Sequence, residues 1–155
     1  MDESPSASDR ELLEELRRHR AELRESMSAL EDALASPAVS DLSRWTQRVE
    51  AALAEVSGDF RAHVDLTEGP KGLYLELLQT SPRLAGAVDG LTRDHLLVGG
   101  QLDDLLTRVA GPDVVADVDG VRSSATALLG RLVRHRQRGA DLVFEAYEFD
   151  IGGET

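Results

Sequence analysis

Apolar residues recur at alternating intervals of three and four along four long stretches of this 155-residue chain. This spacing places side chains along one side of an α-helix, so it predicts four long amphipathic helices. The pattern is cleanest in the third stretch, where its positions are Leu84, Val88, Leu91, His95, Val98, Leu102, Leu105 and Val109. Helices that each carry one apolar stripe bury it by packing against one another, which predicts an all-α bundle.

Proline, glycine and capping residues predict where these helices begin and end. Ser8 and Glu11 form a capping-box signature for the first helix, and Ser40 or Asp41 can cap the second. We expect long helices over residues 8–35, 41–68, 82–110 and 113–150, with a short extra helical segment over residues 72–82. The short connections predict an up-down-up-down bundle formed by residues 8–155 as one domain, after a disordered lead-in of residues 1–7.

Charge and cysteine content narrow the classes of function. The chain has 29 acidic and 17 basic residues, a formal net charge of −12, which opposes binding to nucleic acid or to anionic membranes. Its arginines are scattered along the expected helices, which is typical of solvated faces rather than of a binding patch. It has no cysteine, so a metal would have to be held by nitrogen and oxygen atoms. The N-terminal residues lack the basic and apolar regions of a signal peptide, and no apolar run has the length of a membrane span, so we expect a cytoplasmic protein.

The chain has four histidines, and each falls on the apolar stripe of a different expected helix: His19, His63, His95 and His135. A single buried histidine is usually a core residue that is hydrogen-bonded to the backbone. A core stripe takes about 3/7 of helix positions, so four randomly placed histidines would all fall on stripes only about 3% of the time. Burying four unpaired imidazoles would also cost several kcal/mol. The pattern therefore predicts a metal or cofactor inside the bundle.

The depths of two histidines test whether they can meet. The depth of each histidine is the number of residues between it and Gly111, which lies between the third and fourth helices. His135 is farther from Gly111 along the chain than His95 is. At about 1.5 Å per helical residue, the difference is a mismatch of roughly 12 Å. Part of the mismatch disappears if the fourth helix begins after an irregular segment that contains Gly120.

Three features together resemble the hemerythrin-like family, also called HHE cation-binding domains. These are one histidine on each of four helices, a carboxylate shortly after the second histidine, and the fourth-helix sequence HRQRGADLVFEAYEFDIGGE. The resemblance extends from His19 to the end of the chain. It implies a four-helix bundle that holds two non-haem iron ions, bridged by carboxylates, and that binds dioxygen, senses oxygen or iron, or handles peroxide or nitric oxide.

Carried over to this chain, the resemblance implies a ligand set of His19, His63, Glu68, His95, His135 and Asp141. Glu68 matches the carboxylate of the second helix. Asp141 is the nearest acid after His135 but lies six residues away, which turns it by about 120° from the histidine on a regular helix. Oxygen-carrying members have a second histidine on the third helix, whereas this chain has Leu91 and Gly99 at the two candidate positions.

Three small residues follow the second, third and fourth histidines by one helical turn: Thr67, Gly99 and Gly139. Glycine inside a helix costs about 1 kcal/mol relative to alanine, so its presence needs a reason. Close packing between helices is one explanation. The other is a cavity lined by these residues, which would admit a ligand, a substrate or a larger cofactor to the metal.

We therefore expect a non-haem iron protein whose partner is a small molecule, namely dioxygen, peroxide or nitric oxide. An alternative is an oxidative enzyme, with oxidase- or peroxidase-type activity, that admits a small organic substrate. A single iron or a haem held by two histidines is a further alternative for the cofactor. The last alternative is a bundle that has lost its metal and serves as an interaction module for a protein partner, whose identity the sequence does not indicate.

Overall fold

The computed structural model describes residues 5–148 and 151, except for the side chains of residues 115 and 116. Within this part most of the chain is helical and no strand is present, which confirms the all-α prediction. The four long helices are α1 (Ala7–Ala35), α2 (Leu42–Glu68), α4 (Ala85–Ala110) and α5 (Val118–Tyr147). Shorter elements join them: α3 (Leu73–Thr80), η1 (Pro82–Leu84) and η2 (Pro112–Ala116).

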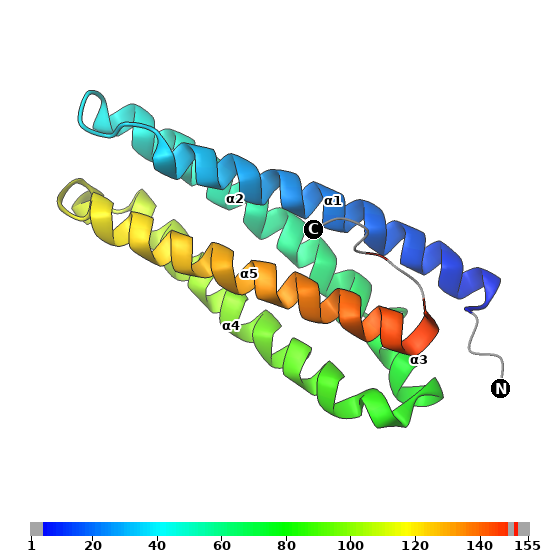
Figure 1. The fold of residues 1–155 in the computed structure, drawn as a ribbon. Coiled ribbons are helices and arrows are strands. Elements are labelled where there is room, and N and C mark those ends of the chain that lie inside the picture. The colour runs from blue at the N-terminus through cyan, green and yellow to red at the C-terminus, as the bar shows by residue number, and fades with distance from the viewer. Residues whose placement is uncertain (1–4, 149–150, 152–155) are drawn as a thin grey trace.

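The long helices lie side by side and alternate in direction (Figure 1). The α1–α2 and α4–α5 connections lie at one end of the bundle, and α3 lies at the other. Helix α2 packs against both α1 and α4, and α4 packs against α5, while the contact between α1 and α5 is the least extensive of the four. The predicted up-down-up-down order is therefore the observed one.

Two helix starts can be compared with the capping predictions. The expected capping box of Ser8 and Glu11 is wrong, because α1 begins at Ala7 and its N-cap is Ser6. The Ser6 hydroxyl accepts a hydrogen bond from the backbone of Asp9, whose carboxylate accepts one from the backbone of Ser6. The predicted lead-in lies partly outside the described residues, since residues 1–4 are not described. At α2, Asp41 is the cap, and its carboxylate accepts from the backbone N–H of Arg44 at 3.0 Å.

The start of the last helix removes most of the mismatch in histidine depth. The expected start at Asp113 is wrong, because residues 112–116 form the tighter η2 turn and α5 begins at Val118. The depths of His95 and His135 are therefore measured from Ala110, where α4 ends, and from Val118. Measured in this way they differ by only about 3 Å along the helix axes, so the two side chains reach the same level. The predicted end of this helix, at residue 150, lies outside the described residues.

The buried apolar side chains form two clusters along the bundle axis. The larger cluster lies toward the α1–α2 and α4–α5 connections and includes Trp45, Val49, Leu102 and Leu128. The smaller one lies toward α3 and includes Leu13, Leu77 and Leu142. Between the two clusters lies a layer of buried polar side chains: Arg20, His63, Thr67, Asp94, His95 and His135.

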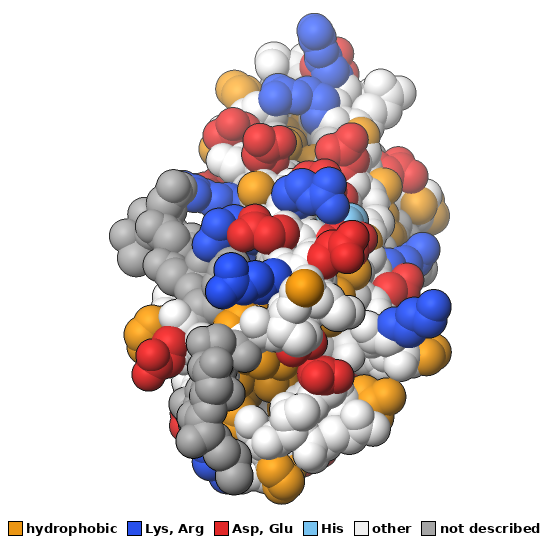
Figure 2. Space-filling view, turned by 90° about the vertical axis from the view of Figure 1, so that its right-hand side faces the viewer, with side chains coloured by type: hydrophobic (Ala, Val, Ile, Leu, Met, Phe, Trp, Pro, Cys, Tyr) orange, Lys and Arg blue, Asp and Glu red, His pale blue; other side chains and the backbone are white. Residues whose placement is uncertain are grey.

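The surface carries charges of both signs. Figure 2 views the molecule from the α3 end, where acidic and basic side chains are interspersed. This mixture agrees with the prediction of solvated arginines for this face, whereas Arg20 is buried. Among the residues described, no helix combines the length and the apolarity that a membrane span requires.

Candidate metal centre

Three of the four histidines converge in the polar layer. His63 comes from α2, His95 from α4 and His135 from α5, and each residue is 7% exposed or less. The Nε2 atom of His135 lies 3.2 Å from Nε2 of His63 and 3.1 Å from Nε2 of His95. These three side chains form a group that could hold one metal ion, with all ligand atoms within 4.8 Å of one another.

Two carboxylates lie behind two of these imidazole rings. Glu68 contacts Nδ1 of His95, and an oxygen of Asp94 lies 3.1 Å from Nδ1 of His135. The same oxygen of Asp94 also accepts a hydrogen bond from Arg138. An ionised carboxylate can only accept, so each Nδ1 must carry the proton and donate it. Both Nε2 atoms are then unprotonated, with their lone pairs directed away from the carboxylates.

Burial keeps the three imidazoles neutral. Desolvation lowers the pKa of His135 to about 4, although the hydrogen bond to Asp94 opposes this change. Desolvation also lowers the pKa of His95 against the opposing effect of Glu68. The pKa of His63 is lowered well below its usual value, first by desolvation and then by the proximity of His95 and His135. At neutral pH, lone pairs of His95 and His135 therefore face each other across 3.1 Å without a shared proton.

Aromatic side chains cover the cluster on two sides. Phe60 of the larger apolar cluster meets the edge of His95 with ring centroids 5.6 Å apart, and it also contacts the other two rings. Tyr74 of the smaller cluster stacks on His95 with centroids 5.9 Å apart. Burial raises the pKa of the Tyr74 hydroxyl, so the group stays neutral. These rings limit water near the nitrogens and strengthen electrostatic interactions there.

The structure does not bring His19 into the cluster. The prediction that His19 faces the core is wrong: its side chain is 28% exposed, and Nδ1 lies 3.6 Å from a carboxylate oxygen of Glu22. The buried position belongs to Arg20, which is 7% exposed. The reason lies two turns earlier, where Leu13 is fully buried and Leu12 only partly so, which rotates the buried stripe by one residue.

The predicted carboxylates lie in different environments. Glu68 is beside His95, as described above, with 31% of its side chain exposed. Asp141 lies apart on the exposed face of α5, where it accepts a hydrogen bond from Gln137 at 2.9 Å. Its distance from the cluster follows from the angle expected between residues six apart on a helix.

The three small residues beside the histidines differ in role. Thr67 is buried, and its hydroxyl donates to the carbonyl of His63 at 2.9 Å within its own helix. A Cβ atom added at Gly99 or Gly139 would meet no heavy atom within 4 Å beyond the adjacent helix backbone. Close packing against another helix therefore does not explain these glycines. The cavity predicted at this place stays a prediction.

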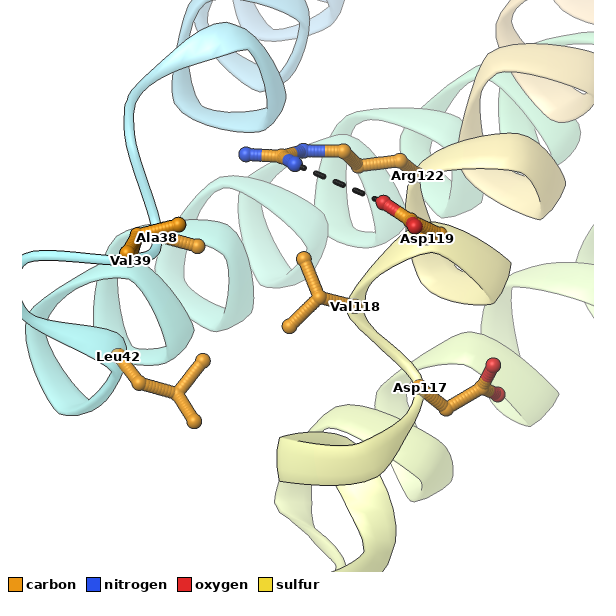
Figure 3. A pocket seen from close by; sticks show the side chains of 7 residues that line it. All are labelled: Ala38, Val39, Leu42, Asp117, Val118, Asp119 and Arg122. Carbon is orange, nitrogen blue, oxygen red and sulfur yellow. Dashed lines mark ion pairs between the residues drawn. The ribbon is translucent and has the colours of Figure 1, made fainter.

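A separate cavity of about 400 Å³ lies at the end of the bundle away from α3, beside the α1–α2 connection and the start of α5 (Figure 3). Arg122 lines it, but this side chain donates to the carbonyls of Leu34 and Ser36 and lies 5.3 Å from the centroid of Trp45. The contacts tie α5 to the end of α1. Arg122 therefore serves to hold the connection between α1 and α2.

Sequence reasoning missed the charged residues that surround the histidines. Asp94 follows Leu91 by three residues and precedes Val98 by four, so it lies at the edge of the apolar stripe of α4. Arg20 lies four residues after Leu16 and three before Leu23, in a similar position on α1. Charged residues at such positions are a signal, because charges are rarely buried without a specific partner.

The chain matches no protein-family description, no curated protein and no solved structure in comparisons with known proteins. Its function therefore has to be inferred from the geometry of the histidine cluster.

Proposed function

We propose that this protein binds one divalent transition-metal ion through the Nε2 atoms of His63, His95 and His135. The observation that carries the proposal is the distance of 3.1 Å between the Nε2 atoms of His95 and His135, each on a ring whose Nδ1 atom contacts a carboxylate. Two nitrogens bound to one ion at about 2.1 Å lie about 3 Å apart in an octahedral shell and about 3.4 Å apart in a tetrahedral one. A cation between the rings would turn a repulsive arrangement into a favourable one.

The surrounding residues fit this role. Glu68 and Asp94 accept hydrogen bonds from the Nδ1 atoms of two candidate ligands, which fixes the ring orientation and makes the metal-binding nitrogen more basic. Neutral imidazoles without a thiolate suit iron, zinc, copper or nickel. The resemblance to hemerythrin-like proteins favours iron among these. Three protein ligands leave coordination positions for a small molecule such as dioxygen, peroxide or nitric oxide, which the protein would bind or sense.

A two-iron site is the second candidate. The observation that favours it is the position of Glu68, a partly exposed carboxylate beside His95 that the hemerythrin-like resemblance assigns to the ligand set. A site of this kind needs ligands on the α1 side as well. Helix α1 presents Arg20 there, and a guanidinium group has no lone pair to offer a metal. We therefore prefer one ion. An oxidative enzyme acting on an organic substrate would use the same metal centre.

Metal analysis of the purified protein tests both candidates. We expect about one iron or zinc ion per chain after reconstitution, and loss of most of that metal in His63→Ala, His95→Ala and His135→Ala. His19→Ala is the matched control, since His19 lies outside the cluster, and it should retain the metal. Two ions per chain would favour the two-iron site. Absence of metal after reconstitution with iron, zinc, copper and nickel in turn would reject both.

A further inference from the structure

The outer side of α4 carries two exposed leucines followed closely by two glycines. Leu96 is 77% exposed and Leu97 is 46% exposed. A Cβ atom added at Gly99 or Gly100 would meet no heavy atom within 4 Å beyond the adjacent helix backbone. Glycine is unfavourable inside a helix unless something must approach the backbone closely, and the leucines have no cover within the described part of the chain. This side of α4 is therefore open to a second backbone.

The same segment is symmetric about Val98. Leu96 lies two residues before Val98 and Gly100 two residues after it, while Arg93 lies five before and Asp103 five after. Successive helical residues are turned by about 100°, so these four residues lie within about 80° of one another around α4. Val98 itself is fully buried on another side of the helix. One face of α4 therefore carries a cation and a leucine before its midpoint, and a glycine and a carboxylate after it.

A face with this symmetry is complementary to itself when two copies run antiparallel. In an isologous contact, residue i meets residue j of the other copy, and j meets i. With a two-fold axis at the midpoint of the segment, each Leu96 faces Gly100 of the other copy, which has no side chain to exclude it. At each end, Arg93 comes within reach of the carboxylates of Asp103 and Asp104, and all three of these residues are exposed.

We propose that this face of α4 is the interface of a homodimer in which the two α4 helices pack antiparallel. A parallel pairing would place Arg93 against Arg93 and Asp103 against Asp103, so the charges select the antiparallel arrangement. The chain has a net charge of −12, which opposes unspecific association. The interface lies on a different side of α4 from the buried His95, so the inference does not depend on the metal site.

The first test measures whether and through which face the chain dimerises. A contact between one pair of helices buries less surface than the roughly 1,200 Å² of stable complexes, so we expect a weak dimer with a Kd of roughly 10 to 1,000 µM. Sedimentation velocity of the metal-free full chain from about 10 µM to about 1 mM covers this range. Leu96→Glu should raise the Kd at least about 10-fold, because it places a carboxylate in the apolar centre of the interface. Val39→Glu is the matched control, since Val39 is a fully exposed apolar residue on the α1–α2 connection, and it should keep the wild-type Kd.

The second test reverses the charges at the two ends of the interface. In Arg93→Glu, and in the double variant Asp103→Arg with Asp104→Arg, like charges meet at both ends, so each variant alone should dimerise more weakly than the wild type. An equimolar mixture of the two should form a heterodimer, because each end then pairs opposite charges. Both chains remain negatively charged overall, so only a local contact explains their attraction. Arg18→Glu, an exposed site on α1, is the control for the change in net charge.

Helical content measured by circular dichroism shows whether each variant is folded. If Leu96→Glu is not folded, the charge reversals at exposed positions still carry the test. A wild-type chain that stays monomeric over the whole concentration range would overturn the proposal, as would an unchanged Kd in Leu96→Glu. A mixture that dimerises no better than its two components would reject the antiparallel arrangement and with it the proposed interface.

Discussion

One oxygen of Asp94 accepts hydrogen bonds from both His135 and Arg138. In Asp94→Asn the amide oxygen can still accept a hydrogen bond from Nδ1 of His135, but the negative charge of the carboxylate is lost. Outer partners of metal-binding histidines typically contribute 10- to 100-fold to metal affinity. We therefore expect the Kd for the metal to rise by roughly that factor in Asp94→Asn, measured by competition with a chelator.

The control for this substitution is Asp89→Asn. Asp89 lies on the same helix, is exposed and pairs with Arg93 at 2.7 Å, so its charge is lost without touching the cluster. Its metal affinity should stay within about twofold of wild type, since exposed ion pairs contribute little. Equal affinities for the two variants would contradict the role given to Asp94.

Single residues also explain why part of the site could be predicted from the sequence. His95 and His135 lie on stripes with one consistent register, and both are buried as predicted. The first helix offers Leu12 and Leu13 together, which allows two registers one residue apart. The difference is a rotation of about 100°, enough to exchange His19 for Arg20 at the buried position. Only packing against the other helices selects between the registers.

At the scale of helices, periodicity predicted the four long elements and the short α3, but it could not locate the start of α5. Residues 112–116 are apolar enough to extend the helical pattern, yet they form the η2 turn. The choice between this turn and another helical turn depends on closing the connection from α4. That local difference determines the level of His135, so convergence of the histidines could not be established from sequence alone.

Gly139 gives a test at the same scale. It lies inside α5, and an added Cβ would meet open space. Replacing glycine with alanine inside a helix should then raise the free energy of unfolding by about 1 kcal/mol, measured by urea denaturation, with metal binding unchanged. Gly72→Ala is the contrasting variant, because its Cβ would lie 2.8 Å from the carbonyl carbon of Thr67 and should destabilise the protein. A loss of stability in Gly139→Ala would show that the space is not open.

At the scale of the molecule, the polar layer divides one bundle into two apolar clusters. Three of the four long helices supply the clustered histidines, and the fourth, α1, is joined to α5 through Arg20. A metal ion would therefore connect α2, α4 and α5 at the level where the apolar core is interrupted. If the ion binds the folded chain and not the unfolded chain, its binding stabilises the fold by mass action.

This layer should make the stability of the metal-free protein depend on pH. The folded pKa values of His63, His95 and His135 are lowered, so the unfolded chain takes up protons first as the pH falls. Stability is then complete above the unfolded pKa of about 6.5 and decreases as the pH falls through the interval down to the folded values. For His135, whose pKa is lowered to about 4, the decrease is on the order of 3 kcal/mol.

Urea denaturation of the metal-free protein between pH 7 and pH 4.5 measures this decrease. Carboxylates titrate in the lower part of the range, so the comparison is with His135→Gln, which keeps a polar side chain but cannot take up the proton. We expect a smaller decrease in the variant than in the wild type. Saturating metal should change the wild-type pH dependence as well, because a bound ion competes with protons for the same Nε2 atoms. Equal pH dependence of wild type and variant would mean that His135 has the same pKa in the folded and unfolded chain, and that its burial does not keep its Nε2 atom unprotonated and available to a metal.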